Sequence, residues 1–398
     1  MNILFYCKYN VTSPPTNGVA TLTRMLSQSF ENANHNCFLA FYQKAEGKDY
    51  PFQEILQLTP HKEESELKFF LKKNKIDIII IQFKFEKKNF YILDLLSGFK
   101  KEWFSGQIIH SINTLPFVEM KGFDLKYLLF LIRKHYPFKN KIKDLIWGIS
   151  CFLHLPYTVR HVAKRYQFIF DKCDKIVVLS EHYIQHYSSN LKNVMKKIVC
   201  IPPPMDIYDE TKIPEQREKN VLVVERLSED YKRVSRAIEI WNRIEKHYNI
   251  TDWNLFIVGN GPDLKYYEHL VQRHNLKNVF FVGQQDSIPY QKKAEILMNT
   301  SAIEGVPMII IEAKQMKVIP MSFDSYEGVY DLIKDNYNGI IVHDGDITAY
   351  AKELHELMLD NLKRNRLKDN CVDGLEKFSR EKILAQWNKL ILSSKQMN

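Results

Sequence analysis

Long apolar runs are missing from this sequence of 398 residues. No stretch approaches the roughly 18 consecutive apolar residues of a membrane-spanning helix. The apolar run that ends at Cys7 is too short for a signal peptide and lacks its flanks. The six cysteines form no C-x-x-C pair, which argues against zinc and indicates reduced thiols. These absences predict a cytoplasmic protein.

Acidic residues are scarce in one region. The formal net charge is +9, and residues 61–172 hold 21 Lys and Arg against 11 Asp and Glu, so the remainder is close to neutral. A basic region within one domain suits an anionic partner, either a lipid surface or a nucleic acid. No recognised nucleic-acid module accompanies the charge, so we expect no nucleic-acid partner.

Length and patterning predict two domains of α/β type. A chain of 398 residues exceeds one ordinary core, and 45% apolar with 26% charged residues is a globular balance. Short apolar runs alternate with helical patterns in both halves, which is typical of Rossmann-like, doubly wound domains. In such folds ligands lie at the carboxyl ends of the strands, here in the cleft between two facing domains.

A polar, Pro-containing stretch at residues 207–220 is typical of a linker. We therefore predict an N-terminal domain over residues 1–206 and a C-terminal domain over residues 217–377, followed by a helix over 378–398. The apolar strand at 2–7 leads into a turn-rich loop and a helix, the opening of a nucleotide-binding α/β unit.

A helical insertion over residues 117–170 interrupts the N-terminal domain. Leu125, Leu128 and Ile132 recur at helical spacing among basic residues. Two interpretations stay open: an insertion packed on its own domain, or an amphipathic surface that rests on an anionic membrane.

Arg226 and Lys232 follow a predicted strand in the second half. A strand-end Arg with a Lys nearby can neutralise a diphosphate without metal, since Arg makes bidentate contacts and Lys acts as a point charge. The alternative is an ordinary solvated loop. Farther on, Gly259 and Gly261 permit close approach of a ligand at a helix start, and Gly18 can do the same from the first domain.

Glu304 and Glu312 bracket a Gly-Val-Pro turn and a short apolar run. Taken alone, the pair is better explained by a loop and a buried helix start. His110 stands at the end of a predicted strand, where the cleft is expected, and is either structural or catalytic. Asp344-Gly345-Asp346 has the D-x-D form of a metal site, but D-G after a strand is also a good turn.

These motifs occur in one order, and together with N-G-I-I-V at residues 338–342 they resemble the family-4 retaining glycosyltransferases of GT-B fold. The resemblance is to members that build bacterial lipopolysaccharide and capsule. It covers almost the whole second domain and is weaker in the first, where it rests on the opening strand and loop, His110 and V-V-L-S-E. The final F-S-R-E-K-I-L-A-Q-W-N-K-L resembles the family's terminal helix, which crosses back onto the first domain.

The resemblance implies a role for each site residue. Arg226 and Lys232 hold the donor diphosphate, Glu304 contacts the donor sugar, and Glu312 contacts the ribose hydroxyls. Further expected contacts come from the amides of Gly305 and Val306, the loop around Gly18, the Gly259 turn and His110. Catalysis then stabilises the charge of a leaving nucleoside diphosphate. No metal and no cofactor are expected.

Three positions depart from the family pattern. The first loop has one glycine where many relatives have two. The spacing from Arg226 to Lys232 is one residue longer than the commonest form, which makes Arg233 a competing contact. Lys317 stands where glycine is frequent.

The sequence thus predicts a retaining, metal-independent hexosyltransferase. Its expected donor is a nucleotide diphosphate sugar, with UDP favoured, and its expected acceptor is a lipid-linked surface saccharide. In the membrane interpretation, residues 117–170 would rest on the inner face of the cytoplasmic membrane. Two alternatives remain: a GT-B sugar-nucleotide epimerase and a non-catalytic GT-B scaffold at the membrane.

Overall fold

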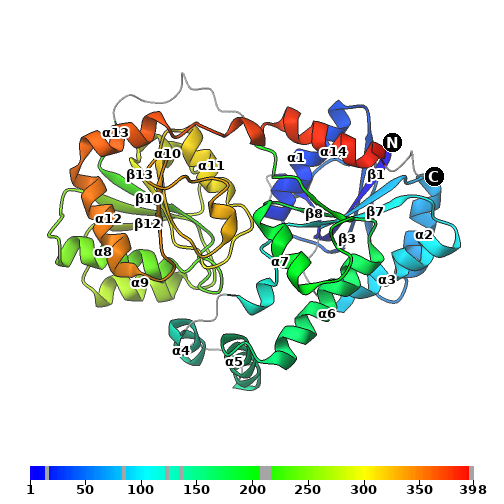
Figure 1. The fold of residues 1–398 in the computed structure, drawn as a ribbon, viewed down its shortest axis with the longest axis horizontal. Helices are drawn as coiled ribbons and strands as arrows, with labels where there is room; N and C mark the ends of the chain where they lie inside the picture. The colour runs from blue at the N-terminus through cyan, green and yellow to red at the C-terminus, as the bar shows by residue number, and fades with distance from the viewer. Residues whose placement is uncertain (14–17, 83–86, 122–124, 134–137, 207–216, 394–398) are drawn as a thin grey trace. The chain divides into compact units, whose positions relative to one another are not determined.

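The computed structural model describes residues 1–13, 18–82, 87–121, 125–133, 138–206 and 217–393. The chain divides into two compact units. Unit 1 comprises residues 1–117, 159–206 and 377–398, and unit 2 comprises residues 118–158 and 207–376. Both units are of α/β type (Figure 1).

Unit 1 is built on a seven-stranded parallel sheet in the order β5-β3-β1-β6-β7-β8-β9. Its strands are β1 (Asn2–Tyr9), β3 (Asn36–Gln43), β5 (Ile55–Gln57), β6 (Ile78–Gln82), β7 (Gln107–Ile112), β8 (Lys175–Val178) and β9 (Ile198–Cys200). The short strands β2 (Thr12–Ser13) and β4 (Lys48–Asp49) pair separately and antiparallel. Its helices are α1 (Gly18–Asn32), α2 (Glu63–Lys73), α3 (Lys87–Glu102), most of α6 (Pro156–Lys172), α7 (His182–Asn190) and α14 (Arg380–Ser393).

The pattern of β6 explains its central place. Its sequence I-I-I-I-Q is buried at every position, as expected where helices cover both faces of a parallel sheet. The strand order reverses between β1 and β6, which is the doubly wound arrangement predicted from the alternating pattern.

Helix α14 belongs to unit 1 although it follows unit 2 in the sequence. It lies beside α1 (Figure 1), and the Trp387 and Phe30 rings meet edge to face with centroids 6.1 Å apart. Ile383, Trp387 and Ile391 are buried in the same apolar core as β1 and β3. The predicted return of the terminal helix to the first domain is confirmed.

Unit 2 is built on a six-stranded parallel sheet in the order β12-β11-β10-β13-β14-β15. Its strands are β10 (Asn220–Val224), β11 (Asn254–Val258), β12 (Val279–Gly283), β13 (Ile296–Asn299), β14 (Ile319–Phe323) and β15 (Ile340–Val342). Its helices include α8 (Val234–Lys246), α9 (Leu264–Arg273), α10 (Ile288–Lys293), α11 (Met308–Gln315), α12 (Ile347–Leu359) and α13 (Asn361–Asp369). The strand order reverses between β10 and β13, so a ligand is expected at their carboxyl ends.

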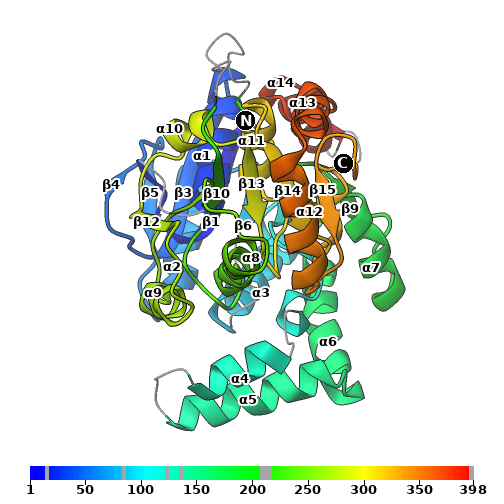
Figure 2. The same ribbon diagram turned by 90° about the vertical axis from the view of Figure 1, so that its left-hand side faces the viewer.

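The helical insertion packs differently from the prediction, which assigned residues 117–170 to the first domain. Residues 118–158, with α4 (Leu125–Arg133) and α5 (Phe138–Phe152), belong to unit 2. Figure 2 shows α4 and α5 side by side. The Phe130 ring lies 5.0 Å from that of Tyr266, and the Tyr127 hydroxyl donates to Asp230 at 2.7 Å. Tyr127 and Phe130 of α4 therefore have partners in the second half of the chain.

No helix within the described residues is long and apolar enough to span a membrane. The predicted linker at 207–220 lies mostly outside the described residues, since residues 207–216 are not among them.

Candidate functional site

The candidate site forms where the strand order of unit 2 reverses. Strands β10 and β13 are neighbours, with Val221 opposite Ile296 and Leu222 opposite Leu297. Glu225 directly follows β10, and Asn299 ends β13. Because the strands are parallel, these residues come together at the carboxyl edge of the sheet. The Asn299 amide donates to Glu225 Oε1 at 3.0 Å, and the Ser301 hydroxyl donates to it at 3.3 Å.

Lys232 joins two carboxylates at this edge. Its Nζ lies 2.7 Å from Glu225 Oε2 and also donates to Glu304. The exposed fractions of the side chains are 22% for Lys232, 5% for Glu225 and 13% for Glu304. We call these three side chains the Lys232 bridge. The structure thus brings together the predicted residues Lys232 and Glu304, from loops 72 residues apart.

Burial and charge shape the ionisation of the Lys232 bridge. Burial raises the pKa of Glu225 to about 7, with Lys232 opposing the rise and Glu304 adding to it. Burial disfavours the charged form of Lys232, but the two carboxylates outweigh it and raise the lysine pKa above its ordinary value. Lys232 is therefore fully charged at neutral pH, whereas Glu225 titrates near it.

Hydrogen bonds join the loop that carries Lys232 to the loop that carries Glu304. The backbone amides of Ala302 and Ile303 donate to the Tyr231 carbonyl at 2.8 and 3.2 Å. The Thr300 hydroxyl donates to the Arg233 carbonyl at 3.2 Å. These hydrogen bonds keep the two loops close together and do not involve the ion pairs of Lys232.

Arg226 and Arg233 have different surroundings. Arg226, next to Glu225 and beyond the end of β10, has an exposed side chain. Arg233 is 2% exposed, and its guanidinium lies 4.2 Å over the Tyr127 ring. Lys232 therefore faces Glu304, whereas Arg233 is buried.

The glycine turn after β11 has a different neighbour from the one predicted. A Cβ on Gly259 would lie 1.9 Å from the Glu225 carbonyl oxygen, and one on Gly261 would lie 2.3 Å from the Leu227 carbonyl oxygen. The Leu227 amide also donates to the Asn260 carbonyl at 3.0 Å. We expected these glycines to admit a ligand. Instead, they allow the turn to pack closely against the backbone of the loop after β10. This packing positions Glu225 and Arg226.

Gly305 and Val306 precede α11, which begins at Met308 after Pro307. The backbone amides at such a helix start suit an anion. Glu312 lies within α11, and burial raises its pKa to about 7; a hydrogen bond with Gln291 lowers it, and Asp286 adds to the rise. Glu304 thus belongs to the loop and Glu312 to the helix.

The two predicted residues of the first domain lie in unit 1. Gly18 begins α1 with open space where a side chain would stand, whereas residues 14–17 of its loop lie outside the described residues. His110 was expected at a strand end, and this is wrong, since β7 continues to Ile112. His110 is 0% exposed, and burial lowers its pKa to about 3, so the imidazole is neutral.

Asp344 and Asp346 of the D-x-D motif have structural partners. Asp344 Oδ1 accepts from Arg236 at 2.7 Å and from Ser325 at 2.8 Å. Asp346 accepts from the Ala349 amide at 2.8 Å and caps α12. These contacts favour the turn interpretation.

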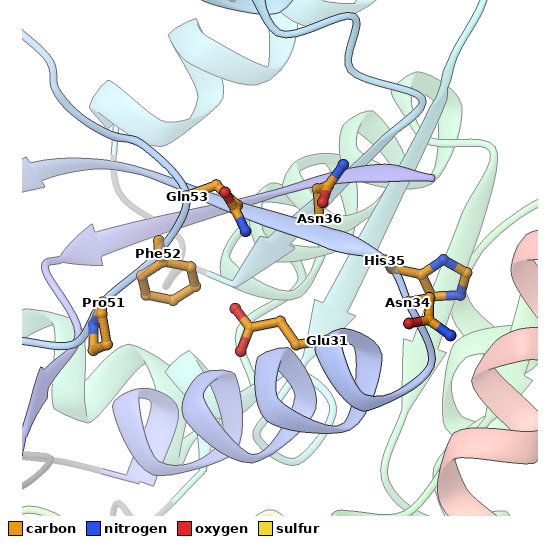
Figure 3. Close-up of a pocket in the computed structure, with 7 residues that line it drawn as sticks. All are labelled: Glu31, Asn34, His35, Asn36, Pro51, Phe52 and Gln53. Atoms are coloured by element: carbon orange, nitrogen blue, oxygen red, sulfur yellow. The ribbon is translucent and has the colours of Figure 1, made fainter.

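A hollow of about 680 Å³ in unit 1 is lined by Glu31, Asn34, His35, Asn36, Pro51, Phe52 and Gln53. Figure 3 shows the Glu31 side chain extending from α1 toward Phe52. Asn36 is the first residue of β3, so the hollow lies at the amino edge of the sheet. This is the edge opposite to the one at which ligands of open α/β sheets bind, and we assign it no role.

Sequence reasoning missed Glu225 and Asn299. Both stand at the carboxyl ends of β10 and β13, the two strands between which the strand order reverses. A predicted strand order for unit 2 would have placed them side by side. The spacing of charged residues alone gave no reason to prefer Glu225 over Glu229, which bonds Ser235 and Tyr267 at 2.6 and 2.9 Å instead.

Comparison with known proteins identifies the fold and relates the second half of the chain to a known family. Residues 206–371 match the model of the family described as glycosyl transferases group 1. The match covers less than half of the chain and lies in its second half. An uncharacterized glycosyltransferase of Haemophilus influenzae is 24% identical over 315 residues, which are 77% of this chain and 86% of that protein.

Two further proteins extend the comparison. The Campylobacter jejuni GalNAc-α-(1→4)-GalNAc-α-(1→3)-diNAcBac-PP-undecaprenol α-1,4-N-acetyl-D-galactosaminyltransferase is 28% identical over 226 residues, which span 56% of this chain and 61% of that protein. The crystal structure of Anabaena Alr3699/HepE in complex with UDP has a TM-score of 0.70 at 13% identity and covers 99% of this chain and 100% of its own. The predicted GT-B class, with two Rossmann-like domains, is confirmed.

Proposed function

We propose that this glycosyltransferase moves a hexose or N-acetylhexosamine from a nucleotide diphosphate donor to a lipid-linked surface saccharide. The observation that carries the proposal is the Lys232 bridge, which sets a charged ammonium beside Glu304 at the carboxyl edge of the sheet, where the strand order reverses. A donor diphosphate needs positive charge at this point, and a donor sugar needs an acceptor for its hydroxyls.

Different residues of unit 2 bind different parts of the donor. Lys232 and the exposed Arg226 bind the diphosphate, and the amides of Gly305 and Val306 at the start of α11 add to this charge. Glu304 contacts the sugar, and Glu312 contacts the ribose. Gly18 and His110 belong to unit 1, and a contact of either with the donor stays a prediction from the family resemblance. Positive charge held ready for the leaving diphosphate lowers the barrier without the need for a divalent metal.

The donor and acceptor classes are proposed from the relatives. A neighbour of the same fold binds UDP, which favours a UDP-sugar as donor. The Campylobacter relative acts on a saccharide linked to PP-undecaprenol, which favours a lipid-linked acceptor. We further propose that transfer retains the anomeric configuration, with attack on an oxocarbenium-like sugar from the face that the nucleotide leaves.

A panel of UDP- and GDP-sugars, with nucleotide release as the signal, tests the proposal. We expect release from at least one donor, and we expect Glu304→Ala and Lys232→Ala to reduce it at least 100-fold. Glu268→Ala and Lys219→Ala remove exposed charges of the same unit and should leave release unchanged. Release by neither the native chain nor any variant would contradict the proposal.

Analysis of the products separates the alternatives. An epimerase would convert the donor sugar in the absence of acceptor, and a scaffold would bind anionic vesicles but no nucleotide in calorimetry. Proton NMR of the glycoside formed reads its anomeric configuration, and an inverted product would contradict retention.

We also propose that residues 118–158 rest on an anionic membrane. On α5, Ile142, Ile146, Ile149 and Leu153, the last just beyond its end, are exposed at helical spacing, although α5 also buries Cys151. Lys143 is exposed beside this stripe. An apolar stripe on a helix that already buries its other side, with basic charge nearby, suits the headgroup region of a bilayer.

Co-sedimentation with phosphatidylglycerol vesicles checks the membrane surface. We expect binding at low salt that weakens as the salt concentration rises, because screening reduces the electrostatic part. Ile146→Glu should weaken binding by about tenfold or more, since burial of an Ile side chain contributes about 1.5 kcal/mol or more. Leu362→Glu, at a residue of α13 that is 82% exposed, is the matched control. Equal loss in both variants would contradict the assignment to α5.

A further inference from the structure

The Lys232 ammonium is already paired with carboxylates of the protein itself. Its ammonium contacts two carboxylates, so the Lys232 bridge has a net charge of −1 when both are ionised. The diphosphate of a nucleotide sugar carries two negative charges of its own. A donor that approaches Lys232 therefore meets a group whose net charge repels it, although the lysine is the expected contact.

Glu225 is held in place by two hydrogen bonds and an ion pair. Its Oε1 accepts from Asn299 at 3.0 Å and from Ser301 at 3.3 Å, and its Oε2 lies 2.7 Å from Lys232 Nζ. The Asn299 amide oxygen is itself fixed by the hydroxyls of Ser322 and Tyr326 at 3.2 and 3.1 Å. Movement of Glu225 would break this network, whereas a proton can reach its Oε2 without disturbing the contacts of Oε1.

The surroundings of Glu225 favour this carboxyl as the proton acceptor. The charged side chains that face it, among the residues the structure describes, are Lys232 from the loop after β10 and Glu304 from the loop after β13. Asn299 and Ser301 face it with neutral groups, and the turn after β11 approaches the backbone of Glu225 at Gly259. Glu225 is the more buried of the two carboxyls, and burial already raises its pKa to about 7.

We propose that binding of the nucleotide diphosphate donor is coupled to the uptake of one proton by Glu225. The proton comes from solvent and neutralises the Glu225 carboxylate, and Lys232 then keeps a single carboxylate partner, Glu304. The Lys232 bridge changes from a net charge of −1 to neutral as the diphosphate arrives. Glu225 is thus a positioning residue that sets the charge available from Lys232, and the inference rests on the proposed function.

The direction of the pH dependence follows from linkage. The bound state holds more protons than the free state, so donor affinity is highest at low pH and is lost as pH rises. With one proton taken up, affinity falls by up to about tenfold for each pH unit above the pKa of free Glu225. The diphosphate of a nucleotide sugar is esterified at both ends, so its own charge is constant across this range.

Calorimetry of the whole chain tests the coupling, with UDP-glucose, UDP-N-acetylglucosamine and GDP-mannose as probes. Titrations at pH 6.5, 7.5 and 8.5 in two buffers of different ionisation enthalpy give the number of protons taken up. For the native chain we expect uptake that approaches one proton at pH 8.5 and affinity at least about tenfold weaker at pH 8.5 than at pH 6.5. The variant Glu225→Gln should take up no proton and keep the same affinity across the range.

Glu312→Gln is the matched control, because Glu312 is the other carboxyl of the site with a pKa of about 7. It should keep the pH dependence of the native chain even if its affinity is lower. Donor binding by the native chain without proton uptake would overturn the inference and leave the proposed function standing. Loss of the pH dependence in Glu312→Gln but not in Glu225→Gln would also overturn it. If no probe binds at any pH, the proposed function itself fails.

Discussion

Replacement of Lys232 by alanine is expected to reduce kcat/KM for donor turnover by about 100-fold to 1,000-fold, the usual cost of removing one preorganised charge from the transition state. The same change leaves Glu225 and Glu304 facing each other without the ammonium between them. Removal of one partner of a buried ion pair costs about 3 to 5 kcal/mol. We expect the free energy of unfolding to fall by an amount near the lower end of this range, because Glu225 can take up a proton. Steady-state kinetics and urea unfolding measure the two effects.

The two effects of Lys232→Ala should separate in a double variant. Addition of Glu225→Gln removes one of the two facing carboxylates and should recover most of the stability, whereas turnover should stay low because no cation faces the diphosphate. Lys219→Ala breaks a pair with Asp252 in which both side chains are 59% exposed, and it should change the free energy of unfolding by less than about 1 kcal/mol. Recovery of turnover in the double variant would contradict the role given to Lys232.

Replacement of Gly259 by alanine is expected to destabilise unit 2 strongly. The residue has φ of 142°, and the added Cβ would lie 1.9 Å from the Glu225 carbonyl oxygen. Neither neighbour can retreat cheaply, since the Gly259 amide donates to Gly283 at 2.8 Å and the Glu225 amide donates to Val258 at 3.0 Å. Backbone strain of about 1 to 3 kcal/mol and overpacking of about 1 to 3 kcal/mol add to roughly 2 to 6 kcal/mol.

Gly98→Ala provides the matched control for this substitution. Gly98 lies inside α3, and nothing stands within 4 Å of the position that its Cβ would occupy. Alanine is the better residue in a helix interior by roughly 0.5 to 1 kcal/mol, so this variant should be as stable as the native chain or slightly more so. Thermal unfolding compares the two. Equal stability of Gly259→Ala and Gly98→Ala would show that the turn does not pack on Glu225.

The sequence was sufficient to predict the α/β class, because the signals for it are local. A run such as I-D-I-I-I-I-Q is apolar on both faces, which a parallel sheet requires. The terminal helix was found through its likeness to a known family, and Trp387 against Phe30 is the contact that holds it.

The charged residues of the site were largely predictable from the sequence. The residues that contact them were less so. Lys232 and Glu304 were expected at one site, and the structure places them in contact. Glu225 was overlooked because its partner Asn299 is 74 residues away, and only the pairing of β10 with β13 brings them together. The packing of Gly259 against Glu225 was overlooked for the same reason, since the atom it approaches belongs to a neighbouring strand end. The insertion was misplaced because helical periodicity shows that a face is apolar but not what covers it.

The most direct test of the account is a crystal structure of the chain with bound UDP. The account predicts the diphosphate within hydrogen-bonding distance of Lys232 Nζ, with the Arg226 side chain turned toward it and the ribose hydroxyls on Glu312. Nucleotide bound away from the Lys232 bridge, for example in the hollow beside Glu31 (Figure 3), would contradict it.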